Sequence, residues 1–210
     1  MDHPLEPQPP AEAIASLRHG FDDAASSFLD QALGELGRLD RAVYAAVADS
    51  PTPSLDEPIR RLSNAANYSR LWIGVAAGLA VIGGRQGRHA ATTGMVAIGV
   101  ASAVVNQGIK RLYPRTRPDR EGEEVPEERH VRMPDSTSVP SGHSASGFAF
   151  ATAVSSQLPI VGAGLRFLAG AVAYSRVHTG VHYPGDAVVG SLIGASVGGM
   201  VAAIAARVGR

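Results

Sequence analysis

The sequence predicts an all-α protein, a polytopic membrane bundle of about five to six helices. Two uncharged runs, Ala90–Ile109 and Ala187–Ala206, are each 20 residues long, and a helix of about 20 apolar residues crosses the ~30 Å hydrocarbon layer of a membrane. Gly190, Gly194 and Gly198 recur at four-residue spacing, a pattern that lets membrane helices approach closely. The alternative is a soluble helical bundle with an alanine-rich interior, which the mean hydropathy of only +0.04 favours.

The first 68 residues are predicted to form an acidic N-terminal arm. Residues 1–10 contain four prolines and no apolar run, which indicates a disordered tail. Segment 28–48 carries leucine and valine at three- and four-residue spacing, with charged residues on its other faces, and is predicted to be an amphipathic helix that Pro51 ends. This helix is too charged to span a bilayer, so we expect it to lie along a membrane surface or against the rest of the protein.

Residues 69–210 are predicted to form the second domain, a membrane domain with five apolar helices. Besides the two 20-residue runs, its uncharged segments are Leu71–Gly84, Ser144–Leu165 and Phe167–Ser175. Pro159 divides the second of these, because proline interrupts a helix. Short turns and one long loop, 119–140, are expected to connect the helices.

The net charge of zero hides an uneven distribution of charge. Residues 1–68 carry a net charge of −6 and residues 69–210 one of +6. A neutral total argues against nucleic acid as a partner bound by a general basic surface. The chain has no cysteine, which excludes disulfides, thiol nucleophiles and cysteine-ligated metal sites.

If the helices alternate in direction, three polar segments meet on one face of the bundle. The first, Lys110–Pro118, has four basic residues and no acid. It is either a basic flank that contacts anionic headgroups or an anion-binding cage. In such a cage Lys110 supplies a compact cation and each arginine a planar fork for phosphate oxygens.

The second polar segment, Pro140–Ser144, directly precedes an apolar helix. Ser141 is either an ordinary helix N-cap or part of a site where free backbone N–H groups bind an anion, with Gly142 permitting close approach. His143 is placed to donate a proton to a leaving oxygen at such a site.

The third polar segment, Ser175–Asp186, contains three possible ligands four residues apart, His178, His182 and Asp186. This spacing is only superficially that of a metal triad, because the glycine and proline residues between them break a continuous helix. His182 and Asp186 suit instead a pair in which the carboxylate fixes the tautomer of the imidazole and raises its nucleophilicity.

Together the three segments resemble the signature of the type 2 phosphatidic acid phosphatase superfamily. That signature is Lys, six residues, then Arg-Pro; Pro-Ser-Gly-His; and Ser-Arg, five residues, His, three residues, Asp. It stands here as Lys110…Arg117-Pro118, Pro140-Ser141-Gly142-His143 and Ser175-Arg176…His182…Asp186. The resemblance covers residues 69–206 and implies a phosphatase core for the membrane bundle. Segment Leu39–Arg88 is also similar to the phosphatase half of actinobacterial phosphatase/diacylglycerol-kinase fusions.

The resemblance implies a role for each signature residue. His182 would attack phosphorus to give a phosphohistidine, and Asp186 would orient the His182 imidazole and favour its charged form. His143 would protonate the leaving alkoxide and then activate water. The phosphoryl oxygens would be held by Lys110, Arg117, Ser141, Gly142 and Arg176. No metal and no other cofactor is implied. Outside the signature, Arg111 and Arg115 are expected to contact headgroups or anionic lipid, and His178 to have a structural role.

The expected activity is metal-independent release of phosphate from a phosphomonoester or diphosphate of a membrane lipid, phosphatidate-like or polyprenyl. Two alternatives stay open: a soluble acid phosphatase or vanadium haloperoxidase of the same superfamily, and a non-catalytic membrane protein that binds anionic lipid. Loop 119–140 is expected to cover the site or to recognise a headgroup.

The arginines outside the polar segments predict the orientation in the membrane. Arg85, Arg88, Arg207 and Arg210 would all lie on the face opposite the site, and basic residues favour the cytoplasmic side. We therefore expect a multi-pass plasma-membrane protein whose active site faces outward.

Overall fold

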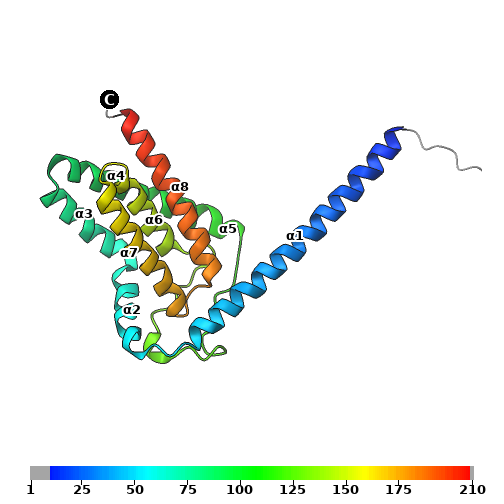
Figure 1. Cartoon of the computed structure of the whole chain (residues 1–210), viewed down its shortest axis with the longest axis horizontal. Helices are drawn as coiled ribbons and strands as arrows, with labels where there is room; N and C mark the ends of the chain where they lie inside the picture. Colours follow the sequence, from blue (N-terminus) through cyan, green and yellow to red (C-terminus); the bar gives the residue numbers. More distant parts are fainter. Residues whose placement is uncertain (1–9, 209–210) are drawn as a thin grey trace, which may run out of the picture. The chain divides into compact units, whose positions relative to one another are not determined.

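The computed structural model describes residues 10–208, and every regular element in that range is a helix. The chain divides into two compact units, residues 1–41 and 42–210. The boundary between them falls inside α1 (Pro10–Ala48), a continuous helix of 39 residues (Figure 1).

α1 begins much earlier than the sequence analysis predicts. Its first residue is Pro10 rather than Phe28, and it ends at the predicted residue, Ala48. The fixed φ of proline suits the first turn of a helix, and the alanine-rich stretch that follows favours helix. The predicted disordered tail was wrong for Pro10, and its other residues, 1–9, lie outside the described residues.

The second unit consists of helices joined by short turns and one long loop. α2 spans Pro53–Ala65, α3 Arg70–Ile82, α4 Gly84–Ala103, α6 Gly142–Ser155, α7 Pro159–His178 and α8 Pro184–Val208. A π-helix, Val104–Ile109, and the short α5, Lys110–Leu112, continue α4, while 3-10 turns occupy Asn67–Ser69 and Glu127–Arg129. The five predicted apolar helices correspond to α3, α4, α6, α7 and α8, and the predicted break at Pro159 is the start of α7.

α6 packs against α4, α7 and α8 in the middle of this unit (Figure 1). Gly190, Gly194 and Gly198 of α8 face its backbone: a Cβ on any of them would lie only 2.2–2.4 Å from a carbonyl oxygen of Ser141, Ala145 or Ala149. Side chains larger than hydrogen would push the two helices apart. The glycine pattern therefore fixes α6 against α8, including the first turn of α6.

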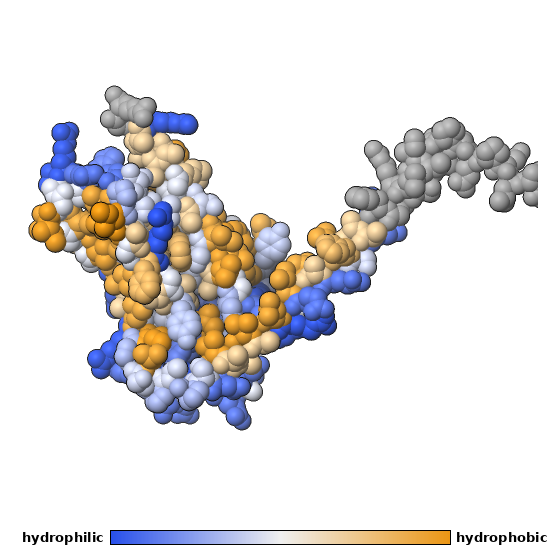
Figure 2. All heavy atoms as spheres, viewed as in Figure 1, coloured by the Kyte–Doolittle hydropathy of each residue, from blue (hydrophilic) through white to orange (hydrophobic). Residues whose placement is uncertain are grey.

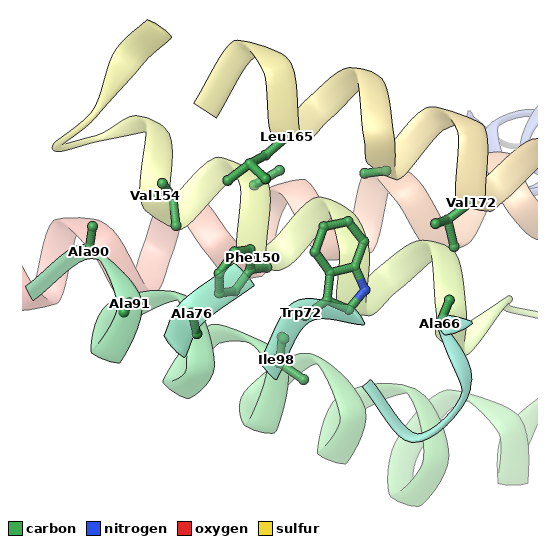
Figure 3. Packing of buried hydrophobic residues seen from close by; sticks show 12 residues of the cluster. Ala66, Trp72, Ala76, Ala90, Ala91, Ile98, Phe150, Val154, Leu165 and Val172 are labelled. Atoms are coloured by element: carbon green, nitrogen blue, oxygen red, sulfur yellow. The ribbon is translucent and has the colours of Figure 1, made fainter. Parts of the chain in front are cut away.

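The core beside α6 is built mainly from small residues around two aromatic rings. Trp72 of α3 and Phe150 of α6 are fully buried, with ring centroids 5.6 Å apart. Figure 3 shows Ile98, Leu165 and Val172 around these rings. Since each aromatic side chain buries about 150–250 Å² of surface, this contact holds α3, and the turn that precedes it, against α6.

Within the described residues, three helical segments are long and apolar enough to cross a membrane: Gly84–Leu112, Pro159–His178 and Pro184–Val208. α2 and Asn67–Ile82 meet the same criteria only as a pair bent by 67°. Ile160, Phe167 and Leu192 point outward and are 64% or more exposed. Figure 2 shows apolar side chains over much of the visible face of the second unit, with weakly polar ones between them and strongly hydrophilic ones mainly towards the two ends of that unit. This distribution suits a lipid environment and favours the membrane bundle over the soluble one.

Segment 42–68 packs within the second unit, although the sequence analysis assigns it to the acidic arm. The Tyr44 ring lies edge-on to the Tyr183 ring, 5.4 Å away, and Ser63 Oγ accepts a 2.6 Å hydrogen bond from Arg176 Nη1. The domain boundary at 68/69 stays a prediction, but this segment contacts residues of the third polar segment.

Candidate active site

Four chain segments meet around one cavity of the second unit. The cavity has a volume of about 230 Å³. Its walls come from the turn before α3, from the π-helix and α5, from the loop before α6 together with the first turns of α6, and from the turn between α7 and α8. Five of the eight predicted site residues line it: Lys110, Arg117, Gly142, His143 and His182. The other three, Ser141, Arg176 and Asp186, are buried and contact neighbouring parts of the site.

Asp186 is fully buried at the start of α8 and is held by three donors. Arg115 Nη1 donates to its Oδ1 at 2.8 Å, and the Tyr183 backbone N–H donates to its Oδ2 at 3.0 Å. Ser138 Oγ also donates to Oδ2. A buried carboxylate is stable only when it is paired in this way. The structure thus places Arg115 on Asp186, and the headgroup contact expected from the sequence stays a prediction.

His182 lies between this carboxylate and a guanidinium. Its Nδ1 is 3.4 Å from Asp186 Oδ2, and its Nε2 is 3.2 Å from Arg117 Nη1. A guanidinium only donates hydrogen bonds, so Nε2 carries the lone pair and the ring proton belongs on Nδ1. Nδ1 makes no hydrogen bond of good geometry within the described residues, and the carboxylate is its nearest ionic partner.

The environment keeps His182 neutral at physiological pH. Burial lowers the pKa of its imidazole to about 4, the Arg117 cation acts in the same direction, and Asp186 opposes the shift. Arg117 is itself fixed, because it donates to the carbonyl oxygens of Ser136 at 2.9 Å and Val181 at 2.7 Å. The ring therefore presents a neutral, unprotonated Nε2 beside a fixed cation.

His143, in the first turn of α6, is the second imidazole of the cavity. Its Nε2 lies 2.9 Å from Asn67 Oδ1. Burial lowers the pKa of His143 well below its usual range, and the nearby cations Arg176, Lys110 and Arg117 lower it further. A dianionic phosphate bound among these cations would act in the opposite direction, because a nearby negative charge favours the protonated ring.

Several donors surround the space between the two imidazoles. Lys110 Nζ donates to Ser136 Oγ at 2.9 Å. Arg176 is 1% exposed, and its Nε has no hydrogen-bond partner within residues 22–208. Ser141 caps α6 and donates its backbone N–H to the Asp186 carbonyl oxygen at 3.0 Å. Lys110, Arg117 and Arg176 can together neutralise the charge of a phosphoryl group.

His178 points away from the cavity, into a buried ionic cluster. Its Nε2 lies 3.0 Å from Asp56 Oδ1, which also accepts from Arg129 Nε at 2.9 Å. His178, His182 and Asp186 are thus not a metal triad. Among the side chains that the structure describes, those of residues 22–208, no group of three or more histidine or acidic side chains is arranged to hold a metal ion.

Arg129 fastens loop 119–140 to the end of α1 and the start of α2. Only 1% exposed, it donates to the carbonyl oxygens of Val47, Ala48 and Ser50 at 2.5–3.1 Å, besides its bond to Asp56. Further along the loop, Pro134 and Ser136 line the cavity. Asn67, Ser136 and Ser138 could not be found from the sequence, since no local pattern links them to the signature, and for Arg115 the sequence did not indicate the contact with Asp186.

A family model and a named relative match most of this unit. The PAP2 superfamily model matches residues 91–210. The decaprenylphosphoryl-5-phosphoribose phosphatase of Mycobacterium tuberculosis is 35% identical over 164 residues, which cover 76% of this chain and 85% of that protein. The likeness to kinase-fused phosphatases stays a prediction.

Two solved structures have the same fold. Aquifex aeolicus LpxE matches with a TM-score of 0.62 and 25% identity, over 78% of this chain and 94% of that one. The first transmembrane PAP2 type phosphatidylglycerolphosphate phosphatase from Bacillus subtilis matches with a TM-score of 0.62 and 21% identity, over 83% of this chain and 88% of that one.

Proposed function

Because the chain belongs to the PAP2 superfamily, we propose that it is a membrane lipid phosphate phosphatase with His182 as its nucleophile. One observation carries the proposal: Nε2 of His182 bears a lone pair in the cation-lined cavity, while its other nitrogen faces the buried Asp186. The imidazole becomes positively charged when it bonds to phosphorus, and the carboxylate is already in place to stabilise that charge.

The reaction consists of two displacements at phosphorus. In the first, His182 Nε2 bonds to phosphorus while the ester P–O bond breaks, and His143 gives its proton to the leaving alkoxide. In the second, water attacks the phosphohistidine and passes a proton to His143, and phosphate leaves with the release of His182. The two steps return both histidines to their starting states.

The charge of the transition state is balanced by fixed side chains. Lys110, Arg117 and Arg176 surround the phosphoryl oxygens, and the Gly142 backbone and Ser141 add polar groups at the start of α6. Preorganised cations in a partly enclosed site can stabilise charge that spreads over three oxygens. The scheme therefore requires no metal ion.

The substrate class follows from the cavity and the relatives. A cavity of about 230 Å³ suits a phosphorylated headgroup, while the apolar tail stays in the surrounding lipid. The Mycobacterium tuberculosis relative is named for a phosphorylated sugar carried on a polyprenyl phosphate. We take a phosphomonoester on a lipid headgroup as the substrate, with a polyprenyl-linked phosphosugar as the first candidate.

A phosphate-release assay in detergent tests the function. The panel contains a polyprenyl-phosphoryl phosphosugar, phosphatidate and phosphatidylglycerophosphate, with EDTA present. We expect release from at least one lipid, inhibition by vanadate, and a loss of about 1,000-fold or more in His182→Ala, because this change removes the nucleophile.

The control for that variant is His89→Ala, because His89 is exposed and hydrogen-bonds Gln157 outside the cavity. This variant is expected to keep full activity. Undiminished release by His182→Ala would refute the proposal. Tight binding of lipid phosphate without any release by the wild-type protein would favour the non-catalytic alternative instead.

We also propose that the protein lies in the plasma membrane with its active site facing outward. The support is the placement of Arg85 and Arg88 at the start of α4 and of Arg207 at the end of α8. Arg85 and Arg88 are separated by α4 from Lys110, which lines the cavity, and Arg207 is separated by α8 from the turn that carries His182. Basic residues favour the cytoplasmic side.

A further inference from the structure

Asn67 contacts the proposed general acid from outside the region that the PAP2 model matches. Its Oδ1 lies 2.9 Å from His143 Nε2, across 76 positions of sequence. The family model begins at residue 91, so Asn67 belongs to no part of the signature. Its neighbours Ala66, Tyr68 and Ser69 line the cavity, which makes this turn a wall of the site.

The backbone beside Asn67 is held in a conformation that side chains disfavour. Tyr68 and Ser69 have φ values of 55° and 57°, two consecutive non-glycine residues in the left-handed region. These residues accompany the 67° bend between α2 and the segment that continues as α3. Such strain persists only where surrounding packing imposes it, and it clusters at functional sites. Trp72, packed on Phe150 of α6, supplies that packing four residues later.

The orientation of the Asn67 amide determines which histidine nitrogen carries a proton. Asn67 Nδ2 points to Asn64 Oδ1, 3.4 Å away, which leaves Oδ1 for His143. A carbonyl oxygen only accepts, so His143 Nε2 must donate. Nδ1 is then the nitrogen that gains and loses the second proton.

We propose that Asn67 is the positioning residue of the general acid, holding the Nε2 proton of His143 so that Nδ1 carries the proton exchanged with substrate and water. In the protonated ring both nitrogens bear hydrogen: Nε2–H stays on Asn67 Oδ1, and Nδ1–H passes to the leaving alkoxide as the P–O bond breaks. The neutral ring keeps its Nε2–H, and Nδ1 then accepts a proton from the attacking water. The amide oxygen also offsets the cations Arg176, Lys110 and Arg117, which disfavour the protonated ring.

This inference rests on the proposed function, and the dependence of rate on the leaving group tests it separately. An alkoxide leaving group needs the proton of a general acid, whereas p-nitrophenolate leaves without one. We compare kcat/KM, which reports the first displacement, for an alkyl lipid phosphate and for p-nitrophenyl phosphate. Leucine is close in size to asparagine but has no oxygen that could accept the hydrogen bond of His143, so Asn67→Leu removes this bond. It is expected to lose about 10- to 100-fold on the alkyl ester and less than about 3-fold on the aryl ester.

Two variants serve as matched controls. Asn67→Asp keeps an acceptor oxygen in place and is expected to keep the wild-type ratio of the two rates. Asn106→Leu changes another asparagine of the cavity wall, one that bonds Ser102 and not His143, and is expected to affect both esters by the same factor. An equal loss on both esters in Asn67→Leu would overturn the inference.

His143→Gln separates this inference from the proposed function. If His143→Gln loses activity mainly on the alkyl ester while Asn67→Leu loses it equally on both esters, the role of His143 as general acid is supported and the proposed role of Asn67 is refuted. If His143→Gln itself loses activity equally on both esters, the proposed role of His143 is refuted.

The ¹⁵N NMR spectrum of His143 gives a second measurement, which needs no turnover of substrate. We expect the Nε2–H tautomer in the wild type and a mixture of the two tautomers in Asn67→Leu. A wild-type ring with its proton on Nδ1 would contradict the inference.

Discussion

Arg115 holds the carboxylate that faces His182. Its guanidinium donates to Asp186 Oδ1 at 2.8 Å and lies over the Tyr183 ring, 4.3 Å from the centroid. Since Ser138 and the Tyr183 backbone occupy the other carboxylate oxygen, both oxygens have partners and the carboxylate is fixed. The arginine thus acts on the histidine through Asp186.

Arg115→Met should therefore lower kcat more than it raises KM. Removing a charged hydrogen-bond partner costs about 1–3 kcal/mol, which corresponds to a loss of roughly 5- to 150-fold in rate. Steady-state kinetics in detergent measures kcat and KM of the variant. Arg111→Met is the control, because Arg111 is exposed and hydrogen-bonds Gln107. A rise in KM with unchanged kcat would instead support the headgroup contact expected from the sequence.

The pH dependence of kcat/KM should carry an acid limb set by His182. Its pKa is lowered to about 4 by burial, so the ring is neutral and nucleophilic at neutral pH and becomes protonated only as the pH falls through about 4. Activity should therefore persist well below the ordinary histidine pKa of about 6.5 and fall only as the pH approaches about 4. Fluorescence of Trp72, the single tryptophan, separates this limb from unfolding. A midpoint near the ordinary histidine value would contradict the assignment.

The signature residues could be predicted at the residue scale because their spacing is itself the signal. Lys110, Arg117, His143 and His182 all line one cavity. Asn67 could not be found in this way, because its contact with His143 depends on a bend between two helices and spans 76 positions.

At the scale of elements, the contact between α6 and α8 depends on side-chain size along one stripe. A Cβ at Gly194 would lie 2.2 Å from the Ala145 carbonyl oxygen, whereas one at Gly199, on the same helix, would meet nothing within 4 Å. These two glycines are equal in helix propensity and differ in the space around them.

Gly194→Ala should destabilise the protein by about 1–3 kcal/mol, because backbone atoms must move to admit the methyl group. Gly199→Ala should be neutral or stabilise by up to about 1 kcal/mol, since alanine favours helix over glycine. Thermal unfolding in detergent compares the two variants. Equal midpoints would show that the stripe does not set the helix contact.

Helix positions followed from uncharged runs and prolines, whereas the anchoring of loop 119–140 did not. Arg129 is one of several arginines in a mixed-charge loop, and nothing in the local sequence marks it as buried. Its partners come from α1 and α2, so only the packing of distant elements identifies it.

At the scale of the whole molecule, helices Gly84–Leu112 and Pro184–Val208 run between the cavity and the opposite face. The class of fold was predictable because a membrane imposes a length and an absence of charge on each span. The central position of the 14-residue α6 was not predictable, because its composition is as apolar as that of the spans around it.

Single-cysteine variants test the proposed orientation, since the chain has no cysteine of its own. Asp135 is exposed in loop 119–140, between Pro134 and Ser136 of the cavity wall, and Arg85 is exposed at the start of α4. A membrane-impermeant maleimide added to intact cells should label Asp135→Cys and should leave Arg85→Cys unlabelled until the cells are opened. The reverse pattern would place the active site in the cytoplasm.

The π-helix Val104–Ile109 sits directly before Lys110 and has a consequence for how the chain tolerates changes in length. A π-helical turn accommodates one residue more than an α-helical turn, and such turns are frequent at functional sites. Because the wider turn already absorbs one extra residue, deleting one residue from it would leave Lys110 at about the same angle about the helix axis, whereas a deletion in the regular part of α4 would rotate the lysine by about 100°. The site should therefore tolerate the loss of one residue at the π-helix better than the loss of one elsewhere in α4.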